Sequence, residues 1–245
     1  MAKIIGILGY GEIGKSIKEV YKKSKKKYKV QVRDLDRDNF KDVDVLNVCI
    51  PWSENFISIV TDTIKEFSPE LTILHSTVIP KTTLTLQNLI PPDCCVVHSP
   101  VRGVHPNLYK GLKTFTKYIG TDYRVCGEKA KSHFTDLGLP NKVIQGSTTT
   151  ELAKLMSTSY YGVVIAWHQE MKDMCDFYNV SFEDAVTEWN TTYNEGYTKL
   201  GNPQFVRPVL YPPGDKIGGH CVTPNADLLK LGFSGDCLDL ILKYK

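Results

Sequence analysis

Two short stretches of the sequence carry residue types that could do chemistry. Near the start lies a glycine-rich loop, Gly9-Tyr10-Gly11-Glu12-Ile13-Gly14. In this GxGxxG spacing the first glycine turns the chain, the second lets backbone amides approach a pyrophosphate, and the third lets a helix pack closely on a strand. Further along, Gly218-Gly219-His220-Cys221 places a thiol after two glycines that let the backbone approach a ligand. These stretches predict a phosphate-binding loop and a cysteine nucleophile.

The residues after the glycine loop fit a dinucleotide site. A predicted strand at 30–33 ends at Asp34, which lies 20 residues beyond Gly14. A carboxylate at this distance accepts hydrogen bonds from the hydroxyls of the adenosine ribose. Because a carboxylate repels the 2′-phosphate of NADP, we predict NAD as the cofactor and NADP as the less favoured one, although Arg33 and Arg37 would offset part of this preference. The alternatives are a glycine turn in another α/β protein and a Rossmann-type enzyme with a different adenosine ligand, such as a methyl donor.

The elements that must position these residues alternate along the first half of the chain. Apolar runs predict strands at 3–8, 30–33, 44–50, 71–74, 94–97, 117–119 and 142–144, with helices at 15–21 and 54–67. Strands alternating with helices predict a parallel doubly wound sheet, whose ligands bind outside the carboxyl ends of the strands. Polar residues at those ends therefore belong to the predicted site. We assign Pro51, Ser76 and Thr77 to the cofactor and Ser99 to the substrate.

The strand signals stop near residue 147, and the rest of the sequence is predicted to be helical. Ser147 to Thr150 supply candidate N-caps for a long helix at 151–178, followed by helices from 181 or 182 to about 200 and from 224 to about 230 or beyond. The predicted fold class is α/β, a Rossmann-type doubly wound parallel sheet at 1–146 followed by a small all-helical domain at 147–245. Because so few helices bury a modest core, we expect the second domain to carry a homodimer interface as well as the substrate site.

Two residues near the start of the long helix are candidates for catalysis. Lys154 and Thr158 stand four positions apart and share one helix face, which would point at the mouth of the sheet domain. A cation there, or His220, would favour the thiolate of Cys221. The alternatives are a solvated lysine and a buried, inert cysteine.

Composition excludes several classes of protein. The chain has 245 residues, 42% of them hydrophobic and 23% charged, with a net charge of +3, which describes a globular protein with no nucleic-acid partner. The basic run from Lys22 to Lys27 is interpreted as a solvated helix end. No apolar run approaches the ~18 residues of a membrane helix, and no leader precedes the first strand. Seven scattered cysteines without CxxC pairs favour the reducing cytoplasm.

Three histidines and two adjacent cysteines near the strand ends raise the question of zinc: His75, His98, His105, Cys94 and Cys95. Their spacing matches no standard zinc pattern, and adjacent cysteines in a strand point to opposite faces. We therefore predict no metal. We expect Cys49, Cys94 or Cys95, and Cys126 to be small buried core residues rather than reactive thiols.

Over nearly its whole length the chain resembles the UDP-glucose/GDP-mannose dehydrogenase family. The matching stretches, in the family's order, are Gly9 to Gly14, Val30 to Asp34, His75 to Thr83, Ser99-Pro100, Thr150 to Lys154, Ile165 to Glu170, and Gly218 to Cys221. The GlyGlyHisCys tetrad is the most specific of these.

The resemblance implies an NAD-dependent dehydrogenase acting on CH–OH groups, in which NAD accepts two hydrides in succession from a sugar C6 alcohol. It implies that Cys221 captures the intermediate aldehyde as a thiohemiacetal, that Lys154 stabilises an oxyanion or moves protons, and that Thr77 lies beside the nicotinamide and a catalytic water. The positions expected at the substrate are Ser99, Arg102, His105, Gly218, Gly219 and His220, with Arg102 and Lys81 as candidates to hold an anionic group.

The sequence departs from the family pattern at three positions. Thr158 stands where the family has Asn, Asn225 where it has Asp, and Val101 where it has Glu. Thr158 can still donate a hydrogen bond, whereas Asn225 cannot act as a base. The candidate substitutes for the lost carboxylates are Asp227, His105, His220 and Glu151.

Family members continue after the cysteine into a third domain that holds the nucleotide part of the substrate, whereas this sequence ends 24 residues after Cys221. The resemblance therefore implies either a smaller, sugar-derived or anionic substrate, or a separate chain that supplies the missing surface. The two-domain 6-phosphogluconate and β-hydroxyacid dehydrogenases also carry a lysine on the first helix after the Rossmann domain, and His98-Ser99-Pro100 with His105-Pro106 more loosely resembles prephenate dehydrogenases. A non-catalytic dinucleotide-binding protein is the remaining alternative.

Overall fold

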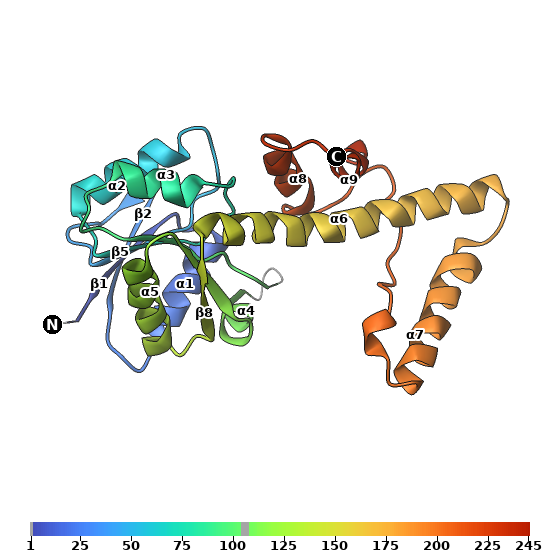
Figure 1. Ribbon diagram of the computed structural model, residues 1–245, viewed down its shortest axis with the longest axis horizontal. Helices are drawn as coiled ribbons and strands as arrows, with labels where there is room; N and C mark the ends of the chain where they lie inside the picture. Colours follow the sequence, from blue (N-terminus) through green and yellow to red (C-terminus); the bar gives the residue numbers. More distant parts are fainter. Residues whose placement is uncertain (1, 104–107) are drawn as a thin grey trace. The chain divides into compact units, whose positions relative to one another are not determined.

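The computed structural model describes residues 2–103 and 108–245, and the chain divides into two compact units, Met1–Lys154 and Leu155–Lys245. Within the described residues, all the strands belong to the first unit and the second is helical (Figure 1). The predicted α/β fold class, a sheet followed by helices, is confirmed.

One sheet organises the first unit, with the strand order β3-β2-β1-β4-β5-β6-β7-β8. Its strands are β1 Ile4–Leu8, β2 Lys29–Asp34, β3 Arg37–Asp38, β4 Val45–Val48, β5 Leu71–Leu74, β6 Val96–His98, β7 Lys117–Thr121 and β8 Asn141–Gln145. Each strand predicted from the sequence is present. The central strands β2, β1, β4, β5 and β6 run parallel, so their carboxyl ends form one edge of the sheet.

The sheet departs from a wholly parallel arrangement at two places. The short strand β3 runs antiparallel to β2 and pairs Arg37 with Asp34. β7 runs antiparallel to β6, with His98 opposite Gly120, and β8 then pairs parallel with β7. The sequence predicted β7 and β8 as strands but did not predict β3, and a strand pattern does not report the direction of the neighbouring strand.

Helices cover both faces of this sheet (Figure 1). One face packs against α2 Phe56–Phe67 and α3 Thr82–Leu89, and the other against α1 Glu12–Lys22, α4 Leu108–Thr114 and α5 Arg124–Asp136. Successive side chains of a strand alternate between the faces: Ile5 and Ile7 pack with α1 and α5, whereas Leu8 packs with α2. Each such fully buried aliphatic side chain contributes about 1.5–3 kcal/mol to folding.

Two of the buried cysteines are joined to each other. Cys95, just before β6, forms a disulfide with Cys126 on α5. Both residues are buried, as expected for Cys126 and for one of Cys94 and Cys95, but the sequence analysis did not predict the disulfide. The two cysteines are 31 residues apart, and their proximity depends on β6 and α5 packing together, which no local pattern reports.

The helical part of the chain begins with α6 Ser147–Phe177, which is 31 residues long. A π-helical segment Glu183–Glu188, α7 Trp189–Lys199, a short 3-10 turn Pro203–Phe205, α8 Val222–Lys230 and α9 Asp236–Lys243 follow. The predicted N-caps of α6 are instead its first turn. The carboxylate of Asp122 accepts hydrogen bonds from the Ser147 hydroxyl and from the Ser147 amide, the latter at 3.2 Å, and so caps the helix from outside.

Close packing fixes the elements of the second unit on α6. A Cβ at Gly162 would lie 2.5 Å from the Val222 side chain and 3.2 Å from that of Ile241, so α8 and α9 approach α6 through this glycine. The Glu170 carboxylate accepts hydrogen bonds from the Tyr244 hydroxyl at 2.8 Å and from Lys243 Nζ at 2.6 Å. Among the residues that the structure describes, no helix combines the length and apolar character needed to cross a membrane.

Candidate functional site

The glycine loop joins β1 to α1, and two of its glycines are required by the fold. Gly9 has φ 93°, and a Cβ there would lie 2.8 Å from the backbone of Cys49 and Ile50. A Cβ at Gly14 would lie 2.1 Å from the Gly9 carbonyl oxygen. Gly11 differs, because a Cβ there would meet no described atom within 4 Å. The space above Gly11 is therefore where a ligand can approach the backbone, as the motif predicts.

Gly11 is also the N-cap of α1, and no side chain caps this helix end. A helix N-terminus presents backbone N–H groups and a partial positive charge, which suit a phosphate. Of the neighbouring residues, Glu12 is exposed on the first turn, and the half-buried Ile13 packs on the core below. The ring of Tyr10 lies 4.9 Å from Lys18 Nζ and 5.6 Å from the Arg37 guanidinium.

Asp34, at the end of β2, is held against the glycine loop. Its Oδ2 accepts a hydrogen bond from the Tyr10 amide at 2.9 Å, and its Oδ1 accepts one from the Leu35 amide at 2.9 Å. Arg33 does not face this carboxylate as a free cation, because its guanidinium pairs with Glu66 and Asp38, each at 2.8 Å. Of the two arginines expected to moderate cofactor preference, only Arg37 has no ion pair among the described residues.

The polar residues at the neighbouring strand ends are held by backbone contacts. The Ser76 hydroxyl, after β5, donates a hydrogen bond to the Ile50 carbonyl at 2.6 Å and thus ties the ends of β4 and β5 together. Pro51 is exposed and Thr77 half-buried beside them. His98 is fully buried: its Nε2 donates to the Ser76 carbonyl at 3.2 Å and its Nδ1 accepts from Thr150 Oγ1 at 2.8 Å. Burial lowers the pKa of His98 to about 3, so the ring is neutral.

Sequence reasoning missed a buried lysine at this edge. Lys117, the first residue of β7, donates hydrogen bonds to the Ser99 carbonyl and to the Pro100 carbonyl at 3.0 Å, and its Nζ lies 3.3 Å from His75 Nδ1. Burial lowers the pKa of Lys117 to about 7. The hydroxyl of Ser99 is buried without a hydrogen-bond partner among the described residues, so the candidate substrate residue presents an unused polar group.

The other predicted substrate residues of the first unit are less constrained. Arg102 is exposed, and its guanidinium lies 5.4 Å from the Phe115 ring and 5.6 Å from the Tyr118 ring. These contacts hold the cation by cation–π attraction. His105 lies outside the described residues.

On α6, Glu151 is committed to structure rather than to a proton relay. Its buried carboxylate accepts hydrogen bonds from the Lys81 amide at 2.6 Å, the Thr83 amide at 2.8 Å and the Thr83 hydroxyl at 2.6 Å, and so caps the start of α3. Burial raises the pKa of Glu151. Lys154, one turn later, ends the first unit, and Thr158 belongs to the second; both are half-buried.

In the second unit Cys221 is the N-cap of α8, half-buried and with a free thiol. Gly219 before it has φ 87°, a conformation that favours glycine, and a Cβ at Gly218 would meet no described atom within 4 Å. Both glycines and His220 are exposed. One turn into α8, the backbone N–H of the buried Asn225 donates to the Cys221 carbonyl at 3.1 Å.

The chain is similar to curated dehydrogenases over part of their length. The chain is 27% identical over 172 residues to the UDP-N-acetyl-D-mannosamine dehydrogenase of Methanococcus vannielii, which covers 68% of this chain and 37% of that protein. It is 26% identical over 233 residues to the enzyme of the same name from Pyrococcus horikoshii, covering 89% of this chain and 52% of that protein. The chain thus spans about a third to a half of the relatives it matches. No family model matches it.

Solved structures share the fold. The UDP-D-ManNAc dehydrogenase of Pyrococcus horikoshii superposes with a TM-score of 0.74 at 20% identity, covering 98% of this chain and 68% of that one. The 3-hydroxyisobutyrate dehydrogenase of Mycobacterium tuberculosis superposes with a TM-score of 0.69 at 14% identity, covering 98% of this chain and 91% of that one. At these identities the likeness concerns the fold alone.

Proposed function

We propose that this chain, which is homologous to the UDP-sugar dehydrogenases, binds NAD and oxidises a CH–OH group. The observation that carries the proposal is the cradle after β1: open space above Gly11, an uncapped helix end, and a carboxylate at Asp34 tied to the Tyr10 amide. In this proposal residues 1–146 bind the dinucleotide and residues 147–245 carry the substrate and dimer surfaces.

The residues present fit a nicotinamide dinucleotide. The backbone amides of the glycine loop at Gly11 and Ile13 would hold the pyrophosphate, and Asp34 would accept hydrogen bonds from the ribose hydroxyls. Pro51, Ser76 and Thr77 would line the nicotinamide end of the site. When bound, the cofactor accepts the hydrides that the oxidation releases. NAD is favoured over NADP because the Asp34 carboxylate would repel a 2′-phosphate, with Arg37 as the cation that opposes this preference.

For the oxidation of an aldehyde, Cys221 is the proposed nucleophile. Its sulfur would bond to the carbonyl carbon, and the carbonyl oxygen would become the hydroxyl of a thiohemiacetal. Loss of a hydride to NAD and of the hydroxyl proton to solvent would leave a thioester. Addition of water would then break the C–S bond, releasing the carboxylate and a proton and restoring the thiol. The amides at the start of α8 would favour negative charge at the sulfur. By resemblance, Lys154 would stabilise the oxyanion and Thr77 would orient the water, with Thr158 and Asn225 as hydrogen-bonding groups.

The proposed substrate is a sugar-derived or anionic alcohol. The named relatives act on UDP-N-acetyl-D-mannosamine, which supports a sugar substrate. Ser99, with its unpaired buried hydroxyl, is the proposed substrate contact in the first unit, together with Arg102 and His105. The exposed loop of Gly218, Gly219 and His220 is the corresponding contact in the second.

A second candidate is the oxidation of a small hydroxy acid. The observation that favours it is the 3-hydroxyisobutyrate dehydrogenase fold, of which 91% is covered by this chain. Such an enzyme would need Lys154 but no cysteine nucleophile, so the role of Cys221 separates the two candidates.

The experiment is a cofactor screen followed by a substrate panel. Binding of NAD, NADP and S-adenosylmethionine is measured by calorimetry, and reduced-cofactor absorbance is then followed with UDP-sugars, sugar phosphates and hydroxy acids. The proposal expects NAD to bind most tightly and a sugar derivative to reduce it. Tight binding of S-adenosylmethionine in place of NAD would overturn it, and turnover of hydroxy acids alone would select the second candidate.

A homodimer is proposed to form through the second unit. Large apolar side chains remain exposed along its helices, including Tyr160, Trp167, Phe177, Tyr178, Trp189 and Leu200. Exposed apolar area of this kind marks interaction surfaces. Light scattering should give twice the monomer mass, and Trp189→Asp should shift it toward the monomer; a monomeric wild-type protein would contradict the proposal.

A further inference from the structure

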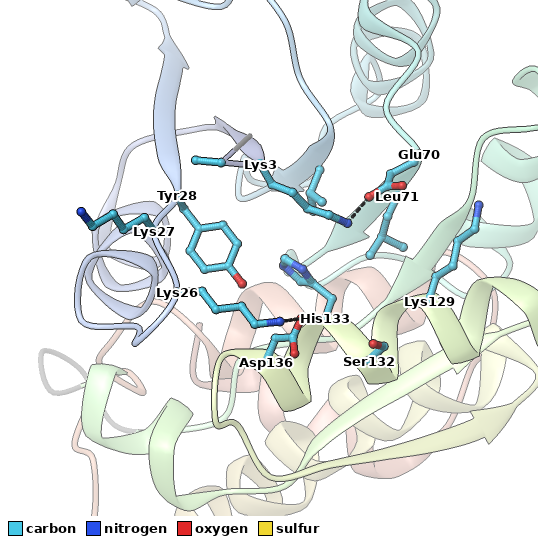
Figure 2. Close-up of a pocket in the computed structure, with 12 residues that line it drawn as sticks. Lys3, Lys26, Lys27, Tyr28, Glu70, Leu71, Lys129, Ser132, His133 and Asp136 are labelled. Carbon is cyan, nitrogen blue, oxygen red and sulfur yellow. Dashed lines mark hydrogen bonds and ion pairs between the residues drawn. The ribbon is translucent and has the colours of Figure 1, made fainter.

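A cavity of about 380 Å³ lies in the first unit at the edge of the sheet opposite the glycine loop. It is formed where the parallel strands begin, at Lys3 before β1, Val45 of β4 and Leu71 of β5. The segment between α1 and β2 and one face of α5 complete its walls (Figure 2). Its size is within the roughly 300–1,000 Å³ typical of small-molecule sites.

The cavity carries an excess of positive charge. It is lined by four lysines, Lys3, Lys26, Lys27 and Lys129, and by two carboxylates, Glu70 and Asp136. Lys3 pairs with Glu70, and Lys26 pairs with Asp136 at 2.6 Å. All four partners are largely exposed, and exposed pairs of this kind contribute only about 0–1 kcal/mol, so either lysine can exchange its partner for an anionic ligand at little cost. The two positive charges in excess match a phosphate dianion.

A buried histidine reaches into this charged cavity. Figure 2 shows the ring of His133 rising from α5 to lie between Lys3 and Lys26. The Tyr21 hydroxyl binds its Nε2 at 2.7 Å from the core side, and among the described residues its Nδ1 has no hydrogen-bond partner. Burial lowers the pKa of His133 to about 4, so the ring is neutral and carries a single N–H. The other titratable groups beside it are Tyr28, Glu70 and Asp136.

A buried hydrogen-bond network lies behind His133. His75 Nδ1 lies 3.2 Å from the Ser99 carbonyl oxygen and 3.3 Å from Lys117 Nζ, and His75 Nε2 lies 2.9 Å from Asn47 Oδ1. The Tyr21 hydroxyl lies 3.3 Å from Asn47 Oδ1, 3.1 Å from Asn47 Nδ2 and 2.7 Å from His133 Nε2. When Tyr21 donates to His133 Nε2, the single proton of the neutral ring is on Nδ1, because a neutral imidazole has one donor and one acceptor nitrogen.

We propose that this cavity is a binding site for a phosphorylated small molecule, whose phosphoryl group accepts hydrogen bonds from His133 Nδ1–H and the ammonium groups of Lys3 and Lys26. Donors from three side chains of one cavity lining suit a tetrahedral anion, and charge-assisted hydrogen bonds are stronger than neutral ones. Lys27 and Lys129 at the rim add attraction for the incoming anion. The site lies at the opposite edge of the sheet from the proposed dinucleotide site and does not depend on it.

The test follows the His133 ring resonances of the full-length protein, labelled on histidine, while inorganic phosphate is added at constant ionic strength. The site predicts a saturable shift of the His133 signal, assigned from its loss in His133→Gln. Lys26→Ala should weaken phosphate binding at least tenfold. Lys131 is an exposed lysine on the same helix as His133 and does not line the cavity, so Lys131→Ala should leave the phosphate affinity unchanged.

Two outcomes overturn the proposal. One is a phosphate effect no larger than that of sodium chloride at equal ionic strength, and the other is equal phosphate affinity of the Lys26→Ala and Lys131→Ala proteins. These lysine variants keep the measurement decisive even where His133→Gln fails to fold. A parallel titration with glucose 6-phosphate separates the sources of the anion, because tighter binding than phosphate indicates an organic phosphate and equal binding indicates phosphate itself.

Discussion

The carboxylate of Asp34 accepts a hydrogen bond from the backbone amide of Tyr10 at 2.9 Å. This bond joins the end of β2 to the glycine loop that follows β1. Asp34 therefore has two roles. It is proposed to accept hydrogen bonds from the ribose hydroxyls, and it also orders the loop that is proposed to hold the pyrophosphate. Its other oxygen is held by the Leu35 amide, so the carboxylate is fixed before any ligand arrives.

Replacing Asp34 with alanine should therefore weaken NAD binding. The loss of a charge-assisted acceptor is worth about 1.5–3 kcal/mol, which corresponds to a roughly 10- to 100-fold higher Kd. Calorimetric titration with NAD measures this change. Asp36→Ala removes an exposed carboxylate two residues away and is the matched control. Equal NAD affinity in the two variants would mean that the ribose is held elsewhere.

The glycines of the loop allow folding and binding to be separated. Gly11→Ala adds a methyl group where no protein atom lies within 4 Å and where φ is −69°, so its folding stability should change by less than ~1 kcal/mol, the scale of an N-cap substitution. Its NAD affinity should fall at least roughly tenfold, because the methyl occupies the approach of the pyrophosphate. Gly14→Ala places a Cβ 2.1 Å from the Gly9 oxygen and should cost about 1–3 kcal/mol or more of folding stability.

Urea unfolding and NAD titration of both variants check this contrast. A Gly11→Ala protein that binds NAD as tightly as the wild type would remove the glycine loop from the cofactor site.

Elements with a strong local pattern were predicted well. β5 was predicted at its observed bounds, because Leu71 to Leu74 combine three aliphatic residues with a β-branched threonine between polar residues. α5 was not predicted at all. Its buried face is built from Cys126, Ala130, His133 and Phe134, and small or polar residues do not give the apolar stripe that indicates a helix. The reversal of β7 was missed for a related reason, since strand direction leaves no periodic signal.

In the candidate site, too, features set by local sequence were predicted and features set by long-range contacts were missed. The glycine loop and Asp34 were found because their function depends on residue type and spacing along the chain. Lys117 was not found, because its burial depends on the carbonyl groups of Ser99 and Pro100, which follow β6. A lysine opening an otherwise apolar strand was the available signal. Glu151 was named as a candidate proton carrier, whereas its partners Lys81 and Thr83, nearly 70 residues earlier, make it a helix cap.

Replacing Cys221 with serine tests the proposed nucleophile. The serine hydroxyl is not ionised at neutral pH, so conversion of aldehyde to carboxylate should fall roughly 1,000-fold or more, while NAD affinity stays unchanged. Single-turnover measurements with the aldehyde of the substrate found in the panel give this rate. Cys237→Ser, which alters an exposed free thiol of the second unit, should behave as the wild type. Full carboxylate formation by Cys221→Ser would refute the thiohemiacetal and favour the hydroxy-acid candidate.

The buried neutral histidines should make the first unit sensitive to acid. The pKa of His98 is lowered to about 3 in the folded protein, against about 6.5 for an exposed histidine. Below pH ~6.5 this histidine binds a proton in the unfolded chain but stays neutral in the folded protein. The contribution of neutral His98 to folding stability is therefore fully present above this pH and is lost as the pH falls toward 3. Each such histidine lowers the free energy of unfolding by about 1.4 kcal/mol for every pH unit of acidification within that window.

His98→Gln keeps a hydrogen-bonding side chain but removes the titrating group. The variant is expected to be less stable than the wild type at pH 7.5, because the glutamine side chain cannot reproduce the geometry of both hydrogen bonds, to the Ser76 carbonyl and to the Thr150 hydroxyl. Its stability should nevertheless decline less steeply between pH 6 and 4, by about 1.4 kcal/mol per pH unit, as measured by urea unfolding followed by circular dichroism. His220→Gln, on an exposed loop, is the control for the loss of one histidine. A wild-type slope in His98→Gln would show that His98 takes up its proton in the folded state.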